Sequence, residues 1–336
     1  MKRYLLTALT ALLCATCVTW AQNSSSTSPN ANGNPGGVRY LELGQPPVVI
    51  HPTVEGMQRA RKLSSSSGGN LYYHGGTSDG LLGRIGVETA PRIYLVFWGS
   101  QWDNNDPSGE AGILENFLPG ASGSSWLNTV TQYCQAVVSG TYFCNGKGTP
   151  AGNATGEYVT YWYDKASKAP AHPRQSQLAS EAVRAAAHFG NTSTDSNASA
   201  QYVIATATGN SSSGFGSQYC AYHSSTSSST SGDVAYTNLP YITDAGASCG
   251  ANFNSLGPKA GITIVEGHEA AETITDQFPS GGWLDSTGYE IGDKCAWISS
   301  GQGASADVSF STGTYPVQSL WSDAFNSDSG GCVLSY

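Results

Sequence analysis

GITIVEGHEAAETITDQFPSGGWLDSTGYEIGDKCAW, residues 261–297, is the stretch around which the rest of this chain is interpreted. It holds one of the six histidines and seven of the 24 acidic residues, although only 12% of the chain is charged. Its centre is an H-E-x-x-E pattern at residues 268–272. We predict a helix from about residue 257 to residue 276, because the Gly-Pro pair at 257–258 suits a helix start and apolar residues recur with helical spacing.

The predicted helix has two different faces. At 100° per residue, Ala271 and Ile274 fall on a packing face, and His268 and Glu272 fall on the opposite one. Residues four apart are neighbours on a helix, so the latter two can share one divalent cation. Glu269 would then act as general base, which is its role in H-E-x-x-H metallohydrolases. The pattern therefore predicts a catalytic glutamate beside two metal ligands.

Further metal ligands must come from the residues that follow. Asp276 is one candidate, and we assign Glu290 and Asp293, which are three residues apart, to complete the metal site. We expect zinc; glutamate in place of a second histidine makes calcium or manganese the alternatives. His223, near a predicted strand end, is a more distant candidate ligand or acid, although a structural role is the preferred interpretation.

Two other interpretations remain open. A solvated acidic helix followed by a loop would have the same composition. A glycosidase would need two carboxyl groups across a sugar site, for example Glu269 with Glu290 or Asp293, at a separation of roughly 5–10 Å. The sequence does not give that separation.

The N-terminal part predicts export. Residues 1–21 have a basic start and an apolar run, which is typical of a signal peptide. Residues 22–70 are rich in Ser, Asn, Gly and Pro and predict a flexible leader or propeptide, and residues 71–336 predict a single globular domain. We therefore expect a secreted, extracellular protein and a monomer. Removing residues 1–21 takes away two positive charges and shifts the formal charge from −9 to −11, which argues against nucleic acid and anionic membranes as partners.

Six cysteines remain after the signal peptide, and an even number in an exported chain favours disulfides. We expect sequential pairing, 134–144, 220–249 and 295–332, because it needs only local loop closures. Strands are predicted at 91–98, 157–163, 201–208, 218–223 and 234–242, and helices at 109–118, 124–137 and 175–189. This order predicts an α/β fold: a mainly parallel sheet covered by helices, zincin-like, with an irregular disulfide-linked C-terminal part.

Several segments resemble the plant EXORDIUM (phosphate-induced protein 1) family. The segments are short and widely spaced, and they occur in the same order as in that family, over residues 71–332. They are Tyr-Tyr-His-Gly-Gly at 72–76, Leu-Leu-Gly-Arg-Ile-Gly at 81–86, Ile-Tyr-Leu-Val-Phe-Trp-Gly at 93–99, Ser-Trp at 125–126, Tyr-Cys-Ala-Tyr-His at 219–223, Thr-Ile-Thr-Asp at 273–276, Asp-Lys-Cys at 293–295 and Leu-Trp at 320–321 with Cys332. The resemblance implies an extracellular, cell-wall-associated protein.

Two functions therefore stand as expectations. The first is a secreted metal-dependent hydrolase of zincin-like design, a peptidase acting on an extracellular peptide or cell-wall substrate. The second is a non-catalytic, EXORDIUM-like extracellular protein that binds calcium through its acidic residues or leaves them solvated. Bound metal and chelator-sensitive activity separate the two.

Overall fold

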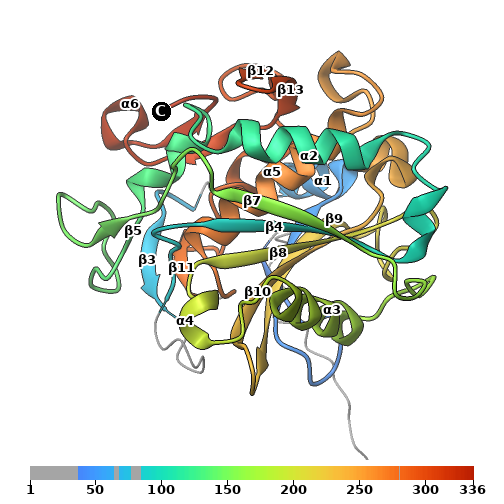
Figure 1. The fold of residues 1–336 in the computed structure, drawn as a ribbon. Helices are drawn as coiled ribbons and strands as arrows, with labels where there is room; N and C mark the ends of the chain where they lie inside the picture. Colours follow the sequence, from blue (N-terminus) through green and yellow to red (C-terminus); the bar gives the residue numbers. More distant parts are fainter. Residues whose placement is uncertain (1–36, 64–67, 77–84, 280) are drawn as a thin grey trace, which may run out of the picture.

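Seven strands form one mixed sheet in a computed structural model that describes residues 37–63, 68–76, 85–279 and 281–336 (Figure 1). The predicted signal peptide and the start of the leader lie outside these ranges, as does most of the Leu-rich segment at 81–86. The strand order is β1–β2–β9–β10–β8–β4–β7. In chain order the strands are β1 (Val38–Arg39), β2 (Val48–Pro52), β4 (Arg92–Trp98), β7 (Tyr158–Asp164), β8 (Ala200–Thr206), β9 (Tyr219–Ser228) and β10 (Gly232–Leu239).

The sheet changes character across its width. Strands β7, β4, β8 and β10 are parallel neighbours, whereas β9 runs antiparallel to β10, β2 antiparallel to β9, and β1 antiparallel to β2. The α/β class is confirmed, but parallel pairing is confined to one half of the sheet. Strand β8 is buried along its whole length, and β4 is buried except at Arg92, as their continuous apolar sequences predict.

Helices cover both faces of the sheet. Helix α3 (Gln175–His188) packs on β8 and β10, and α5 (Ala260–Thr275) packs on β9, β10 and β2 of the opposite face (Figure 1). Helix α2 (Glu110–Ala121) lies on the same side as α5 and contacts it. None of the helices in the described ranges has the length and apolar character that a membrane span requires.

The remaining elements are short. They are α4 (Thr194–Asn197), α6 (Phe325–Asp328), the 3-10 helices η1 (Ser100–Asp103), η2 (Leu127–Gln132), η3 (Ile242–Cys249), η4 (Phe253–Ser255) and η5 (Asp293–Cys295), and the strand pairs β3 (Tyr72–Gly75) with β11 (Gly282–Leu284), β5 (Cys134–Gln135) with β6 (Thr149–Pro150), β12 (Ala306–Phe310) with β13 (Gly313–Val317), and β14 (Leu320–Ser322) with β15 (Gly331–Val333). The helix predicted at 124–137 is therefore only a six-residue 3-10 helix followed by a strand.

Part of the predicted leader is built into the fold. Strand β2 pairs with β9 over five residues and is fully buried, and α1 (Val54–Leu63) follows it. These residues are ordered parts of the domain, so the prediction of a flexible leader does not hold for 48–63. The burial comes from pairing with a strand about 170 residues later, which the local sequence does not reveal. Whether residues 22–70 are removed stays a prediction.

The three disulfides link the cysteines in the predicted sequential order. Cys134 is bonded to Cys144, Cys220 to Cys249 and Cys295 to Cys332, at Cα–Cα distances of 6.2, 5.5 and 5.7 Å. The second joins the start of β9 to the end of η3. The third ties the loop after β11 to β15 and so fixes the position of residues 290–295.

Glu88 is a buried acid, and its burial predicts how the stability of the protein depends on pH. Burial raises the pKa of Glu88 to about 8, and the amide of Gln201 donates to its carboxylate at 3.0 Å. Because the folded-state pKa lies above the unfolded value of 4.5, the folded protein holds an extra proton between pH 4.5 and 8, and stability falls as pH rises through this window. In Glu88→Gln, the fall in the free energy of unfolding over this pH window should be smaller by up to about 5 kcal/mol. Urea unfolding of both proteins at pH 5 and pH 8.5 measures the difference; equal pH dependence of the two would contradict it.

Candidate metal centre

Helix α5 carries the H-E-x-x-E pattern through the interior of the protein. All sixteen of its residues are buried, because the sheet covers one side and β13 and α2 cover the other. The close packing of α5 against the end of η3 depends on Gly261, because an added Cβ atom there would clash with the backbone oxygen of Cys249. Both predicted faces of the helix are therefore buried, the face with His268 and Glu272 as well as the packing face. The solvated acidic helix is excluded for the same reason.

The pair predicted to share a cation lies together in the structure. His268 Nε2 is 3.0 Å from Glu272 Oε2, and neither atom has a hydrogen-bond partner within the described part of the protein. The loop after β11 adds Asp293, whose backbone N–H donates to Glu272 Oε1 at 2.9 Å. One ligand atom from each of these three residues lies within 4.8 Å of the others. We call His268, Glu272 and Asp293 the first triad.

The other imidazole nitrogen of His268 is held from the far side. His268 Nδ1 lies 3.2 Å from Gln318 Oε1, and the amide nitrogen of Gln318 donates to the backbone oxygen of Gly292 at 2.8 Å. With Nδ1 protonated and donating to Gln318, Nε2 is left as the lone-pair nitrogen that faces Glu272. Metal-binding histidines are commonly oriented in this way.

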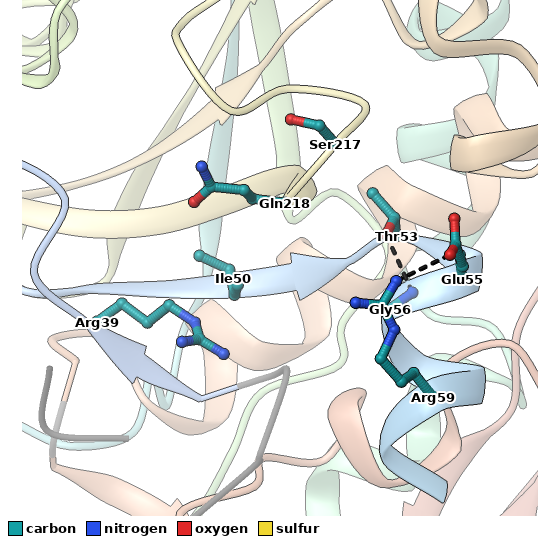
Figure 2. A pocket seen from close by; sticks show the side chains of 8 residues that line it. All are labelled: Arg39, Ile50, Thr53, Glu55, Gly56, Arg59, Ser217 and Gln218. Carbon is teal, nitrogen blue, oxygen red and sulfur yellow. Dashed lines mark hydrogen bonds and ion pairs between the residues drawn. The ribbon is translucent and has the colours of Figure 1, made fainter. Parts of the chain in front are cut away.

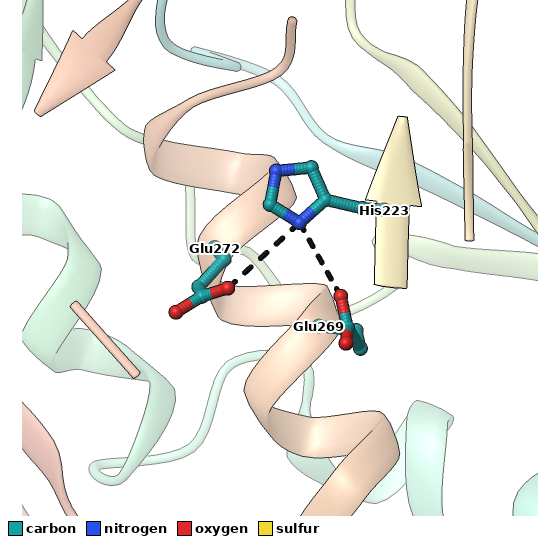
Figure 3. A group of neighbouring side chains, drawn as sticks. All are labelled: His223, Glu269 and Glu272. Carbon is teal, nitrogen blue, oxygen red and sulfur yellow. Dashed lines mark hydrogen bonds and ion pairs between the residues drawn. The ribbon is translucent and has the colours of Figure 1, made fainter. Parts of the chain in front are cut away.

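Strand β9 brings a second histidine to the same helix (Figure 3). His223 Nδ1 lies 3.3 Å from Glu269 Oε2 and 3.8 Å from Glu272 Oε2, and Figure 3 shows the ring above both carboxylates. We call His223, Glu269 and Glu272 the second triad; its ligand atoms also lie within 4.8 Å of one another. The sequence interpretation favoured a structural role for this histidine and missed its position, which follows from the packing of α5 directly on β9.

Glu290, which the sequence assigns as a metal ligand, belongs to neither triad. Its Oε1 lies 3.8 Å from His223 Nε2, on the side of the ring away from the second triad. The two atoms are too far apart for a direct hydrogen bond, and neither has a hydrogen-bond partner among the described residues. Asp276, the other early candidate, is buried at the end of α5 and is also in neither triad.

A third histidine comes from the part of the leader that lies in the sheet. Alternation along β2 puts Val48 and Ile50 on the α3 side, so His51 points toward α5. Its ring lies 4.0 Å from the ring of His268 and 4.8 Å from that of Trp297. One local signal marks this residue, the short apolar run VVIHP at 48–52, which follows two prolines and precedes a helix.

The electrostatics of the centre suit a cation. Burial lowers the pKa of His268 to about 4 and that of His223 to about 3, so both rings are neutral lone-pair donors at neutral pH. Burial, reinforced by neighbouring carboxylates, raises the pKa of Glu269 and of Glu290 well above the usual range. Buried carboxylates either take up protons or bind cations, and the imidazoles between them favour cations.

The centre is closed to solvent. Each residue of both triads is at most 1% exposed. Strand β2 forms part of the cover: the indole N–H of Trp297 donates to the Pro52 oxygen at 2.7 Å, and the Arg61 guanidinium donates to the Trp297 oxygen at 3.0 Å. Leader and C-terminal loop are thus hydrogen-bonded to each other over the site.

A pocket of about 250 Å³ opens beside this cover (Figure 2). Among the residues that line it are Arg39 of β1, Ile50 of β2 and Arg59 of α1. Arg59 is paired with Glu55 at 2.8 Å, whereas the charge of Arg39 interacts with that of Asp293 in the first triad. The pocket therefore lies beside the part of the leader that joins the sheet. One of its lining residues, Arg39, interacts electrostatically with the metal centre.

Comparison with known protein families, curated sequences and solved structures gives no significant match to this chain. The resemblance to the EXORDIUM family therefore stays a prediction, and so does the zincin-like design. Function has to be inferred from the geometry of the centre.

Proposed function

We propose that this protein is an extracellular, metal-dependent hydrolase whose divalent cation is held by the first triad. The observation that supports this most is the contact of His268 Nε2 with Glu272 Oε2 at 3.0 Å, both atoms buried and without a hydrogen-bond partner among the described residues. Two carboxylates and one neutral imidazole fit zinc or manganese, and the imidazole makes calcium the weaker choice. A cation there would supply Lewis acidity and lower the pKa of a water.

Glu269 is the candidate general base of this proposal. It follows His268 directly in α5, lies outside the first triad, and its carboxylate contacts His223 at 3.3 Å. Burial first, and then the charge of Glu272, raise the pKa of Glu269 well above its usual range, which makes its carboxylate a stronger base than an exposed one. The proposed substrate is a peptide, because the H-E-x-x-E pattern resembles the H-E-x-x-H pattern of metallopeptidases.

Activation by loss of the leader belongs to the same proposal. Strand β2 occupies the position next to β9 and pairs with it antiparallel, so a substrate cannot reach His223 or His268 past it. Cleavage after α1 followed by release of β2 would expose both histidines and the free edge of β9. An extended peptide can bind to such an edge by strand addition.

The closed centre also favours one alternative, a non-catalytic extracellular protein with a structural cation. Structural metal sites have no open ligand position and contribute to folding energy, and a fully buried site meets the first condition. This alternative predicts that the protein binds metal and needs it for stability but hydrolyses nothing before or after loss of the leader.

Metal content and peptidase activity test the proposal together. Purified wild type should contain stoichiometric metal, Glu272→Ala should contain less, and the wild type trimmed to remove residues 22–70 should cleave peptides in a chelator-sensitive manner. In the trimmed protein, Glu269→Gln should keep the first cation and lose at least about 100-fold in kcat/KM, whereas Asp307→Asn, which changes an exposed acid on β12, should behave as wild type. Absence of metal from the wild type and from Glu272→Ala alike would refute the proposal. Metal without activity in the trimmed protein would favour the structural alternative.

A further inference from the structure

We infer that the centre holds two divalent cations at once, the second one bound by the second triad. Both triads contain Glu272, and each adds a histidine of its own. The carboxylate of Glu272 would thus lie between the two cations. The count of two does not depend on hydrolysis; only the use of both cations in catalysis rests on the proposed function.

The separation of the two histidines is the first argument. Ligands bonded to one zinc-like cation at about 2.0–2.2 Å lie at most about 4.4 Å apart. Among the described residues, no group with ligand atoms within 4.8 Å of one another contains both His223 and His268. One cation therefore cannot bind both rings in this arrangement, although both direct a nitrogen at Glu272 Oε2, at 3.8 and 3.0 Å.

The spacing within the second triad is the second argument. Tetrahedral ligands at about 2.1 Å from a cation are about 3.4 Å apart. His223 Nδ1 lies 3.3 Å from Glu269 Oε2 and 3.8 Å from Glu272 Oε2, close to that spacing.

The two histidines are also oriented alike. His268 turns Nε2 toward Glu272 and has Gln318 behind Nδ1; His223 turns Nδ1 toward Glu272 and has Glu290 behind Nε2. Gln318 pairs with His268 Nδ1 and so leaves Nε2 for a cation, whereas the Glu290 carboxylate faces His223 Nε2 without a direct hydrogen bond. In both rings the nitrogen that faces Glu272 is the candidate ligand. One cation would account for only one of the two arrangements.

The net charge of the buried carboxyl groups favours two bound cations over one. Seven carboxyl groups of residues 261–297 are at most 1% exposed, and one of them, Asp285, is paired with Lys294 at 2.8 Å. The other six are Glu266, Glu269, Glu272, Asp276, Glu290 and Asp293. Arg39, whose charge interacts with Asp293, supplies one positive charge. If all six are ionised, one divalent cation leaves a net charge of −3 and two leave −1, and buried charge is costly unless it is offset. Mixed imidazole and carboxylate ligands select zinc, manganese or iron(II) for both positions.

Manganese tests the count without any assay of activity. The full chain is stripped with a chelator, reloaded with excess Mn²⁺ and desalted, and bound manganese is measured by elemental analysis and by electron paramagnetic resonance. Wild type should bind two Mn²⁺ per chain and show magnetic coupling between them, since bridged cations lie about 3.5–4 Å apart. His223→Gln should bind one and lose the coupling. His188→Gln, which alters an exposed histidine of α3, should keep two.

Glu269→Gln is the second variant, and it also separates the two roles of this residue. The second triad predicts one Mn²⁺ in this variant. Two Mn²⁺ would overturn the assignment of Glu269 as a ligand of the second cation and leave it only the role of general base. One Mn²⁺ in the wild type would overturn the two-cation centre and leave the proposed function intact, and none would overturn both. Two coupled Mn²⁺ in a folded His223→Gln protein would overturn the assignment of the second triad.

Discussion

Removal of the bound metal is expected to lower the Tm of the folded protein by about 8–16 °C. A ligand present at about 1,000 times its Kd stabilises the state that binds it by about 4 kcal/mol, and in a domain of this size each kcal/mol is worth about 2–4 °C. The first triad is wholly buried, so its carboxylates lose their compensating charge when the cation leaves. Differential scanning calorimetry before and after chelation, followed by reloading, measures the effect.

The matched variants make this expectation specific. Glu272→Gln removes the carboxylate shared by both triads and should unfold at nearly the same temperature with and without chelator. Asp307→Asn changes an exposed acid on β12 and should respond to chelator as the wild type does. A chelator-insensitive Tm in a wild type known to contain metal would contradict a stabilising role for the cation. The three disulfides must stay intact during the measurement, because a reducing agent would destabilise every sample alike.

Much of the fold could be predicted because its signals are local. The apolar runs of β4 and β8 and the alanine-rich pattern of α3 are each contained in one stretch of sequence, and the structure places all three within one or two residues of the predicted bounds. The disulfide pairs were also predictable, since each closes a loop of 10 to 37 residues. In the centre, the grouping of His268 with Glu272 follows from helical spacing alone.

The rest depends on contacts between distant segments. His51 reaches the centre only because Val49 of β2 pairs with His223 of β9 in the antiparallel register, and nothing within 22–70 predicts that partner. The burial of α5 on its outer side is likewise due to β13, some 50 residues further along the chain. The strand predicted at 218–223 stops short of the polar run 224–228, yet β9 continues through this run because β10 supplies its hydrogen bonds and Ser224 also donates to the Pro47 oxygen.

A methyl group at Gly292 is expected to disable the centre while leaving the fold in place. The backbone there has φ −83° and ψ −44°, which alanine adopts without strain, so the effect of Gly292→Ala is steric. The added Cβ would lie 2.6 Å from His268 Nδ1 and 2.9 Å from Glu272 Oε1. Neither neighbour can move away freely, since Gln318 holds the ring and the Asp293 N–H holds the carboxylate.

We expect Gly292→Ala to weaken metal binding by roughly 10–100-fold, the range seen when the groups that orient metal ligands are disturbed. Overpacking should lower the free energy of unfolding by about 1–3 kcal/mol. Gly112→Ala is the matched control, because a Cβ there meets nothing within 4 Å and the residue is exposed on α2. It should bind metal as the wild type does and be slightly more stable, as alanine is favoured in a helix by about 1 kcal/mol. Titration of the stripped proteins with Mn²⁺ measures the affinities. Wild-type affinity in Gly292→Ala would show that cation binding does not involve His268 and Glu272 as the structure arranges them, and would place the metal elsewhere in the protein.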